Sequence, residues 1–223
     1  MDSNLRPTRI PLFTGQGNPA VNTVQTHQQA VRASQSSFGG LLLSSCHHLF
    51  LQELSSLSPE EALHVNLLPS DFSTPDSLLA VPSPQHSTNA VISGTRLFLI
   101  QTLLYLYFES ASDSSTSPSH SFGASLISNS ELQAGILGFS SGILPATVVA
   151  TSSSTIDYIY RSVQAFRLAF WIGVRAHIYA SSTLTNSIQR ALPWSLSFSG
   201  LDKARVQSAI DDFGQVRFPL LFS

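Results

Sequence analysis

The chain has 223 residues, of which 43% are hydrophobic and only 11% are charged, and its formal net charge is −2. This hydrophobic content is enough for a large folded core, which excludes a disordered protein. The small net charge provides no electrostatic footprint for nucleic acid or an anionic membrane, so we expect neither as a partner. The single cysteine, Cys46, excludes an internal disulfide and a cysteine-based zinc site.

Targeting signals are not evident in the sequence. Residues 1–9 lack the apolar core of a signal peptide. The longest apolar runs, residues 97–108 and 165–174, are shorter than the roughly 18–20 residues that a membrane span needs. These features predict a soluble, cytoplasmic protein.

The first part of the chain predicts one strand followed by helices. Residues 10–13 form a short apolar run that ends in the glycine-rich residues 14–18, which is typical of a core strand and its loop. Residues 21–57 carry a helical pattern that is broken at residues 39–40, so we expect two helices there. Ser58, followed by a proline and two glutamates, is typical of a helix start.

The rest of the chain alternates between helices and connections. Residues 68–89 are rich in proline and predict an irregular connection. Residues 93–109 are apolar nearly all round, which predicts a buried helix packed on a sheet. Residues 156–179 predict a long helix with one apolar stripe. Residues 194–199 alternate as a strand does, and residues 201–213 predict a final helix.

The histidines do not predict a metal site. His47 and His48 are adjacent, and on a helix their side chains point about 100° apart, which is unsuitable for one tetrahedral ion. His64 and His86 have no carboxylate or cysteine at ligand spacing. We expect no bound metal.

A Gly-Phe-Ser-Ser-Gly motif, from Gly138 to Gly142, has the form of a nucleophile elbow. An apolar strand-like run, residues 134–139, leads into Ser140, and an apolar helix-like run, residues 143–150, follows it. The flanking glycines remove Cβ atoms that would crowd a tight strand-to-helix turn. A helix starting here would direct free N–H groups at an oxyanion on the serine. Ser140 is therefore the candidate nucleophile, and an ordinary Gly-Ser turn is the alternative.

The loop and the motif together resemble a known family. Residues 13–17 (Phe-Thr-Gly-Gln-Gly) are similar to the Gly-Gln-Gly loop of the acyltransferase domains of fatty-acid and polyketide synthases, and residues 138–142 occupy the place of their nucleophile elbow. Residues 142–150 and 163–175 most closely resemble the starter-unit acyl-carrier-protein transacylase domain of fungal non-reducing polyketide synthases. That domain is related to the acetyltransferase domain of fungal fatty-acid synthase. The resemblance covers residues 10–213.

The resemblance implies an α/β fold, an acyltransferase-type doubly wound parallel sheet with a nucleophile elbow. Residues 8–192 would form the large subdomain, which would be incomplete. Residues 193–223 would form the first β-α unit of a truncated, ferredoxin-like small subdomain. In the family the general-base histidine lies farther downstream, so we expect it beyond Ser223. The chain is then expected to be a truncated piece or a shortened product, weakly active or inactive alone.

The resemblance also implies roles for individual residues. Ser140 matches the acyl-accepting nucleophile, a position at which many starter domains have cysteine. The backbone N–H groups of Gln16 and Ser141 match the oxyanion hole. The glycines of the loop and the elbow are Gly15, Gly17, Gly138 and Gly142.

An uncharged acyl group is the expected substrate. Malonyl transferases have histidine before the serine, whereas this chain has Phe139, which makes the acyl pocket more apolar. The arginine that binds the malonyl carboxylate in those enzymes is replaced here by Ala165. Arg167 lies about 200° around the helix from that position and should not substitute for it.

The implied function is that of an acyltransferase in polyketide biosynthesis. It would load a starter acyl group from acyl-CoA or a carrier protein, through a Ser140-bound acyl intermediate, onto the phosphopantetheine thiol of an acyl carrier protein. We expect no bound cofactor or metal, and we expect the carrier protein and the other domains of a multidomain synthase as partners. The alternatives are a serine esterase of the α/β-hydrolase type, with His177 and Asp157 as the remaining triad members, and a non-catalytic carrier-docking module.

Overall fold

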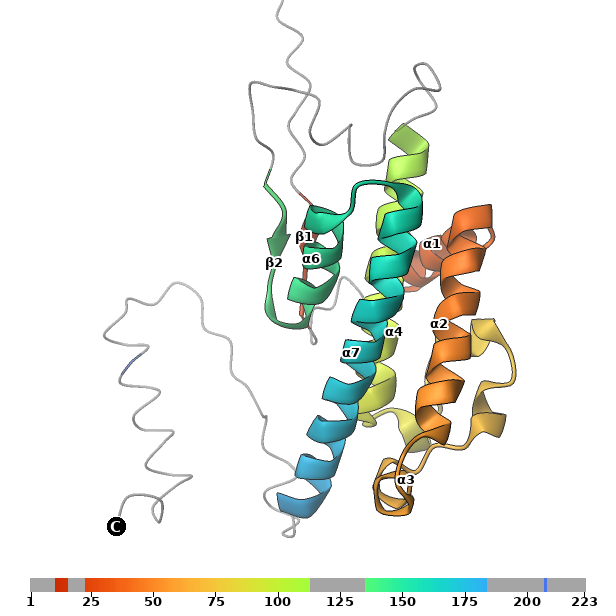
Figure 1. Ribbon diagram of the computed structural model, residues 1–223, viewed down its shortest axis with the longest axis vertical. Helices are drawn as coiled ribbons and strands as arrows, with labels where there is room; N and C mark the ends of the chain where they lie inside the picture. Colours follow the sequence, from red (N-terminus) through yellow and green to blue (C-terminus); the bar gives the residue numbers. More distant parts are fainter. Residues whose placement is uncertain (1–10, 16–22, 113–134, 184–206, 208–223) are drawn as a thin grey trace, which may run out of the picture. The chain divides into compact units, whose positions relative to one another are not determined.

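The computed structural model describes residues 11–15, 23–112, 135–183 and 207 (Figure 1). The chain divides into two compact units, residues 1–183 and 184–223. All the elements described below belong to the first unit, and the second is described only at Gln207. The subdomain boundary expected at residue 192 and the strand and helix expected after it therefore lie outside the described residues, except for Gln207.

The first unit is mostly helical. Its α-helices are α1 (Val24–Ser34), α2 (Ser37–Ser55), α3 (Pro59–Val65), α4 (Ala90–Ser112), α6 (Ile143–Thr151) and α7 (Thr155–Thr183). The proline-rich connection between α3 and α4 is irregular, as predicted. It contains short 3-10 helices at Pro69–Phe72, Pro75–Leu78 and Pro84–His86.

The break between α1 and α2 lies at Gln35 and Ser36, so the prediction of a break at the glycine pair was wrong. Ser36 caps α2, because its Oγ accepts a hydrogen bond from the Gly39 N–H at 3.1 Å. Gly39 therefore belongs to the first turn of α2. A Cβ at this position would collide with the carbonyl group of Ala33 at the end of α1, so glycine permits a close approach here rather than ending a helix.

The helix start predicted at Ser58 is confirmed. Ser58 Oγ accepts from the Glu61 N–H at 3.2 Å, and Glu61 Oε2 accepts from the Ser58 N–H at 3.0 Å, which together form a capping box. The helix ends at Asn66, whose φ of 50° is the left-handed conformation common at helix C-termini.

The buried helix predicted in the middle of the chain is α4, and it packs mainly against α1 and α7 rather than on a sheet. Asn89 caps it, since Asn89 Oδ1 accepts from the Val91 N–H at 2.9 Å. Among the described residues, the stretch Ala90–Glu109 has the length and composition of a membrane span. The apolar runs counted in the sequence were too short for one. Within the fold 61% of the apolar 18-residue part of that stretch is buried, and a core helix passes the same test.

Aromatic side chains join three helices in the core. Phe50 of α2 lies with its ring centroid 5.4 Å from Phe170 and 6.4 Å from Phe166, both on α7. Phe98 of α4 lies 6.2 Å from Phe166. All four are buried, and the apolar stripe predicted on α7 is the face that makes these contacts. Burial of this area supplies most of the stabilisation of the helical body.

Two short strands form a parallel sheet. In β1 (Leu12–Phe13) and β2 (Leu137–Gly138), Leu12 is opposite Leu137 and Phe13 is opposite Gly138. A parallel pair joined through helices is α/β in character. Within the described ranges the sheet has only these two strands. Helix α6 contacts both strands, so the sheet and this helix together position the turn at Ser140 (Figure 1).

Candidate active site

Ser140 lies in the turn between a strand and a helix, as the motif predicted. Strand β2 ends at Gly138, and Phe139 continues the extended backbone with φ −119° and ψ 130°. One 3-10 turn, Ser140–Gly142, then leads directly into α6. The side chain of Ser140 is therefore held at the carboxyl end of a parallel strand and at the entrance to a helix.

The backbone of Ser140 is strained. Its φ is 55°, and among the described residues the only other non-glycine with a positive φ is Asn66. Asn66 ends α3, a position where this conformation is common. Ser140 is not at a helix C-terminus, and serine adopts this conformation rarely, at a cost of about 1–3 kcal/mol. Such strain persists only where the surrounding structure imposes it, and it is often found at functional sites.

Close packing of backbone against backbone imposes this turn. A Cβ on Gly142 would collide with the carbonyl group of Phe13 and lie 2.8 Å from the Thr14 nitrogen. A Cβ on Gly138 would lie 2.7 Å from Ala146 Cβ. Both elbow glycines therefore occupy positions where a side chain does not fit. The sequence analysis expected this crowding at a strand-to-helix turn.

The loop that follows β1 touches Ser140. A Cβ on Gly15 would lie 2.6 Å from Ser140 Cβ and 3.0 Å from Ser140 Oγ. The structure thus brings Gly15 and Ser140 together although 125 positions separate them in the sequence. Gln16 and Gly17, the other predicted residues of this loop, lie outside the described residues.

Behind the elbow lies a group of buried polar atoms. Thr14 Oγ1, Gln101 Oε1 and Ser141 Oγ are buried and have no hydrogen-bond partner among the described residues. The Gln101 side chain donates from Nε2 to the Thr14 carbonyl oxygen at 2.6 Å. Our sequence analysis did not single out Gln101. The available signal was a long polar side chain in the middle of a mostly apolar helix.

Several large apolar side chains on the elements that hold Ser140 are exposed. Phe139 is 70% exposed, and it is accompanied by other large exposed apolar residues on the strands and on the first turn of α6. These are Leu12, Leu137 and Ile143. The side chains of Leu12 and Leu137 lie opposite each other in the strand register. The elbow and the two strands that lead to it therefore carry exposed apolar side chains.

The charged neighbour of Ala165 has a partner elsewhere. Arg167 Nε forms an ion pair with Glu53 Oε1 at 2.6 Å, and the other oxygen of Glu53 accepts from Trp171 Nε1 at 2.8 Å. Glu53 is on α2, so this pair joins α2 to α7. Ala165 itself is half-buried against the core. Its assignment to an acyl pocket stays a prediction.

None of the six histidines that the structure describes has a hydrogen bond with Ser140. His27 and His47 pair with backbone carbonyl oxygens of Leu79 and Phe72. His177 lies near His64, and partial burial lowers its pKa.

The esterase triad considered from the sequence does not form. Asp157 and His177 lie on the same continuous helix, α7, 20 residues apart. At 1.5 Å per residue this separates them by about 30 Å. Asp157 instead binds Arg161 at 2.8 Å and accepts from the Ser153 N–H at 2.9 Å. These two residues cannot serve one serine.

In the described part of the chain no group of three or more histidine, cysteine, aspartate or glutamate side chains is arranged to hold a metal ion. Cys46 is fully buried, and burial raises the pKa of its thiol. It therefore stays protonated and unreactive.

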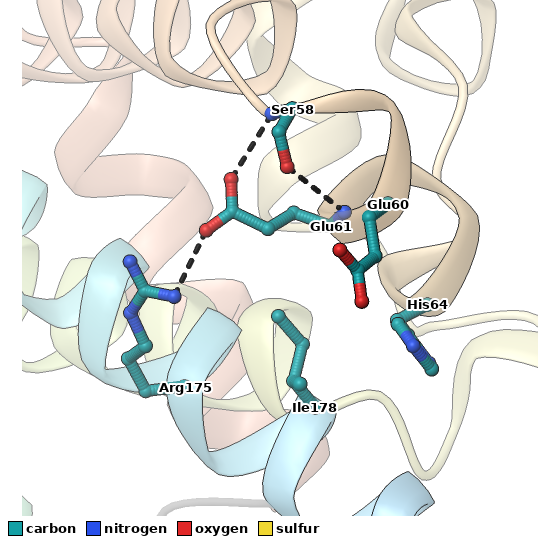
Figure 2. A pocket seen from close by; sticks show the side chains of 6 residues that line it. All are labelled: Ser58, Glu60, Glu61, His64, Arg175 and Ile178. Carbon is teal, nitrogen blue, oxygen red and sulfur yellow. Dashed lines mark hydrogen bonds and ion pairs between the residues drawn. The ribbon is translucent and has the colours of Figure 1, made fainter.

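A cavity of about 370 Å³ lies between α3 and the last part of α7, away from the elbow in the sequence (Figure 2). Its lining residues are Ser58, Glu60, Glu61, His64, Arg175 and Ile178. Arg175 Nη1 is paired with Glu61 Oε1 at 2.9 Å. The charge of Arg175 is therefore already neutralised, and no residue of the elbow lines the cavity. This cavity is not part of the candidate site.

Known sequences match nearly the whole chain. A sequence profile described as "Starter unit:ACP transacylase in aflatoxin biosynthesis" matches residues 12–218. The orsellinic acid synthases of Armillaria ostoyae and Armillaria mellea are 46% and 45% identical to the chain over 207 residues, and that of Beauveria bassiana is 32% identical over 215 residues. Each of these alignments covers 92% of this chain and 9% of the relative. No solved structure shows a significant match.

The match of the profile extends over more than nine-tenths of the chain and includes both β1 and the elbow. The family resemblance predicted from the Gly-Gln-Gly loop and the elbow motif is thereby confirmed. The chain spans about a tenth of the length of the curated relatives it matches. The chain belongs to the family of starter-unit acyl-carrier-protein transacylases of fungal polyketide synthases.

Proposed function

We propose that this chain transfers an uncharged starter acyl group, through an ester on Ser140, to the phosphopantetheine thiol of an acyl carrier protein. The observation that carries the proposal is the backbone of Ser140, a strained turn between a parallel strand and a helix that contacts Gly15, in a chain of this family. The acyl donor is acyl-CoA or an acyl carrier protein. We infer from the similar orsellinic acid synthases that the whole protein is a multidomain polyketide synthase.

The reaction consists of two transfers. Ser140 Oγ adds to the thioester carbonyl carbon while a general base takes its proton, and the C–S bond then breaks as the donor thiol leaves with that proton. In the second transfer the carrier thiol loses its proton to the base and attacks the serine ester. The C–O bond breaks and the proton returns to Ser140 Oγ. In both transfers the backbone N–H groups of Gln16 and Ser141 stabilise the oxyanion.

The surroundings of Ser140 favour uncharged acyl groups. Phe139 supplies exposed apolar surface beside the hydroxyl, and Ala165 offers no cation. Arg167 is the arginine of α7 nearest to Ala165 in the sequence, and its charge is already paired with Glu53. A malonyl carboxylate would therefore lose its hydration without gaining a partner, which is unfavourable.

The family also suggests the larger architecture. We propose that β1 and β2 belong to a doubly wound parallel sheet of an acyltransferase subdomain over residues 8–192. Residues 193–223 begin a ferredoxin-like small subdomain. The site uses acyl-CoA or an acyl-phosphopantetheine group as substrate and needs no resident cofactor or metal, and the protein acts in the cytoplasm with its carrier protein.

Intact-protein mass spectrometry tests the chemistry. The chain, and in parallel a protein extended along the same gene, would be incubated with acetyl-, hexanoyl- and malonyl-CoA. We expect an acyl adduct on the wild type that is lost in Ser140→Ala, with acetyl or hexanoyl labelling faster than malonyl. An adduct that persists in Ser140→Ala would refute the nucleophile. Faster malonyl labelling would refute the proposed specificity, and binding of the carrier protein without any adduct would indicate a docking module instead.

A further inference from the structure

Gln101 is the buried polar side chain of α4 that reaches out of its own helix toward the elbow. The other two buried polar residues described on the middle turns of α4, Thr95 and Thr102, donate their hydroxyl hydrogens to carbonyl oxygens of the preceding turn. Gln101 is only 6% exposed, and its Nε2 donates to the Thr14 carbonyl oxygen at 2.6 Å. A carbonyl oxygen can only accept, so the amide nitrogen must face Thr14.

This bond holds the peptide unit that leads into the loop after β1. A trans peptide directs its C=O and its N–H in opposite directions, so fixing the Thr14 carbonyl oxygen toward Gln101 directs the Gly15 N–H away from it. Gly15 is the residue in contact with Ser140. The Thr14 nitrogen is also close to Gly142, since a Cβ on Gly142 would lie 2.8 Å from it. The amide of Gln101 therefore sets the position of the loop backbone relative to the serine.

Burying the amide of Gln101 is unfavourable for stability, because its oxygen atom has no hydrogen-bond partner among the described residues. Gln101 Oε1, Thr14 Oγ1 and Ser141 Oγ are all buried without a partner among the described residues. A methionine at position 101 would fill similar space and would avoid leaving an amide oxygen unpaired in the interior. Methionine would, however, leave the Thr14 carbonyl oxygen without its donor, so what the amide adds beyond filling space is the position of that carbonyl group.

We propose that Gln101 is a positioning residue for acyl transfer. Its amide holds the Thr14–Gly15 peptide, the part of the loop that contacts Ser140, in the position that acylation of Ser140 requires. This inference rests on the proposed function, and it adds a residue from a different helix to the machinery of the same site.

The test compares Gln101→Met with Thr102→Val, a matched control at the neighbouring buried position of the same helix. The rate of Ser140 acylation by hexanoyl-CoA is measured against its concentration in the protein extended along the gene, and the melting temperature is measured in parallel. For Gln101→Met we expect the maximal rate to fall about 10- to 100-fold. We expect the half-saturating concentration to stay close to that of the wild type, and the melting temperature to fall by only a few degrees, because the Thr14 carbonyl oxygen loses its donor. Thr102→Val should keep the wild-type rate.

Gln101→Glu provides a second readout. An ionised carboxylate cannot donate to the Thr14 carbonyl oxygen, whereas a protonated one can. The ratio of the variant's acylation rate to that of the wild type should therefore rise as the pH falls. The same ratio for Gln101→Met should stay flat with pH.

Four results would count against the proposal. A wild-type rate in Gln101→Met, or a loss that matches a loss of folded protein, would overturn the positioning role alone. A flat pH ratio for Gln101→Glu would do the same. If the wild type is not acylated at Ser140, the proposed function fails first and this inference fails with it.

Discussion

The helical body and the elbow of this chain are built in opposite ways. In the body, formed by α1, α2, α4 and α7, aromatic and aliphatic side chains are buried against one another, and Phe50, Phe166 and Phe170 lie at the centre. In the elbow a serine holds a strained backbone angle, and large apolar side chains such as Phe139 face outward. Polar atoms behind the elbow are buried without partners in the described structure.

The difference shows where stability and function reside. Apolar burial in the body provides the free energy of folding, and the elbow uses part of it to maintain a conformation that is unfavourable locally. Strain, unpaired polar atoms and exposed apolar surface each destabilise a protein slightly. Their concentration at one turn is the pattern expected of a site shaped for chemistry rather than for stability.

The largest expected effect comes from replacing Ser140 by glycine. Loss of the proposed nucleophile should lower the rate of acylation by about 10⁴- to 10⁶-fold. Glycine adopts a φ of 55° without strain, so the free energy of unfolding should rise by about 0.5–1 kcal/mol relative to Ser140→Ala, an equally inactive control that keeps the strain. Urea unfolding measures this difference. Equal stability of the two variants would show that the turn is not strained.

A large loss of stability should follow truncation in the body. Phe50→Ala removes the ring at the centre of the aromatic cluster and should lower the free energy of unfolding by about 3–5 kcal/mol. Phe38→Ala on the same helix serves as the control, because Phe38 is 47% exposed and should lose less than about 1 kcal/mol. Similar losses for both variants, measured by urea unfolding, would contradict this division between core and surface.

A smaller effect is expected for a methyl group added inside the elbow. In Gly142→Ala the new Cβ would press on the backbone of Phe13 and Thr14, which should cost about 1–3 kcal/mol and displace β1 from the serine. Gly135→Ala is the matched control, since nothing lies within 4 Å of a Cβ there. Stability and acylation rate would be measured for both. If Gly142→Ala behaves like Gly135→Ala, the close packing of the elbow is unimportant.

The smallest effect concerns the surface of the body at α3 (Figure 2). The hydrogen bond from the Ser58 N–H, together with the Ser58 hydroxyl contact and the Arg175 charge, lowers the pKa of Glu61. The folded-state pKa is then below the unfolded one. The stabilisation is complete above the unfolded pKa of about 4.3 and is lost as the pH falls through the folded pKa.

Thermal melts at pH 7 and pH 3 can detect this contribution. Glu61→Gln should melt slightly below the wild type at pH 7, and the gap should close at pH 3. Glu60→Gln, at the neighbouring exposed position, controls for the loss of one negative charge near the start of α3. A gap for Glu61→Gln that stays constant with pH would refute the role of the carboxylate.

Features that depend on neighbouring residues were predictable from the sequence. The order of strand, Ser140 and helix, the helix start at Ser58 and the apolar stripe of α7 were all predicted, and the structure has each of them. These features follow from periodicity and from hydrogen bonds over three or four residues. The two glycine-containing motifs indicated an acyltransferase, and residues 142–150 and 163–175 indicated the starter-unit family, which the family match confirms.

Only the tertiary structure decided the features that join distant parts of the chain. These include the contact of Gly15 with Ser140, the bond from Gln101 to Thr14 and the pairing of Arg167 with Glu53. The same holds for the short helix break at Ser36, since glycine at position 39 serves a neighbouring backbone instead of ending a helix. The three long-range contacts join residues 87 to 125 positions apart, and the break at Ser36 depends on the approach of one backbone to another. Local propensity carries no information on either.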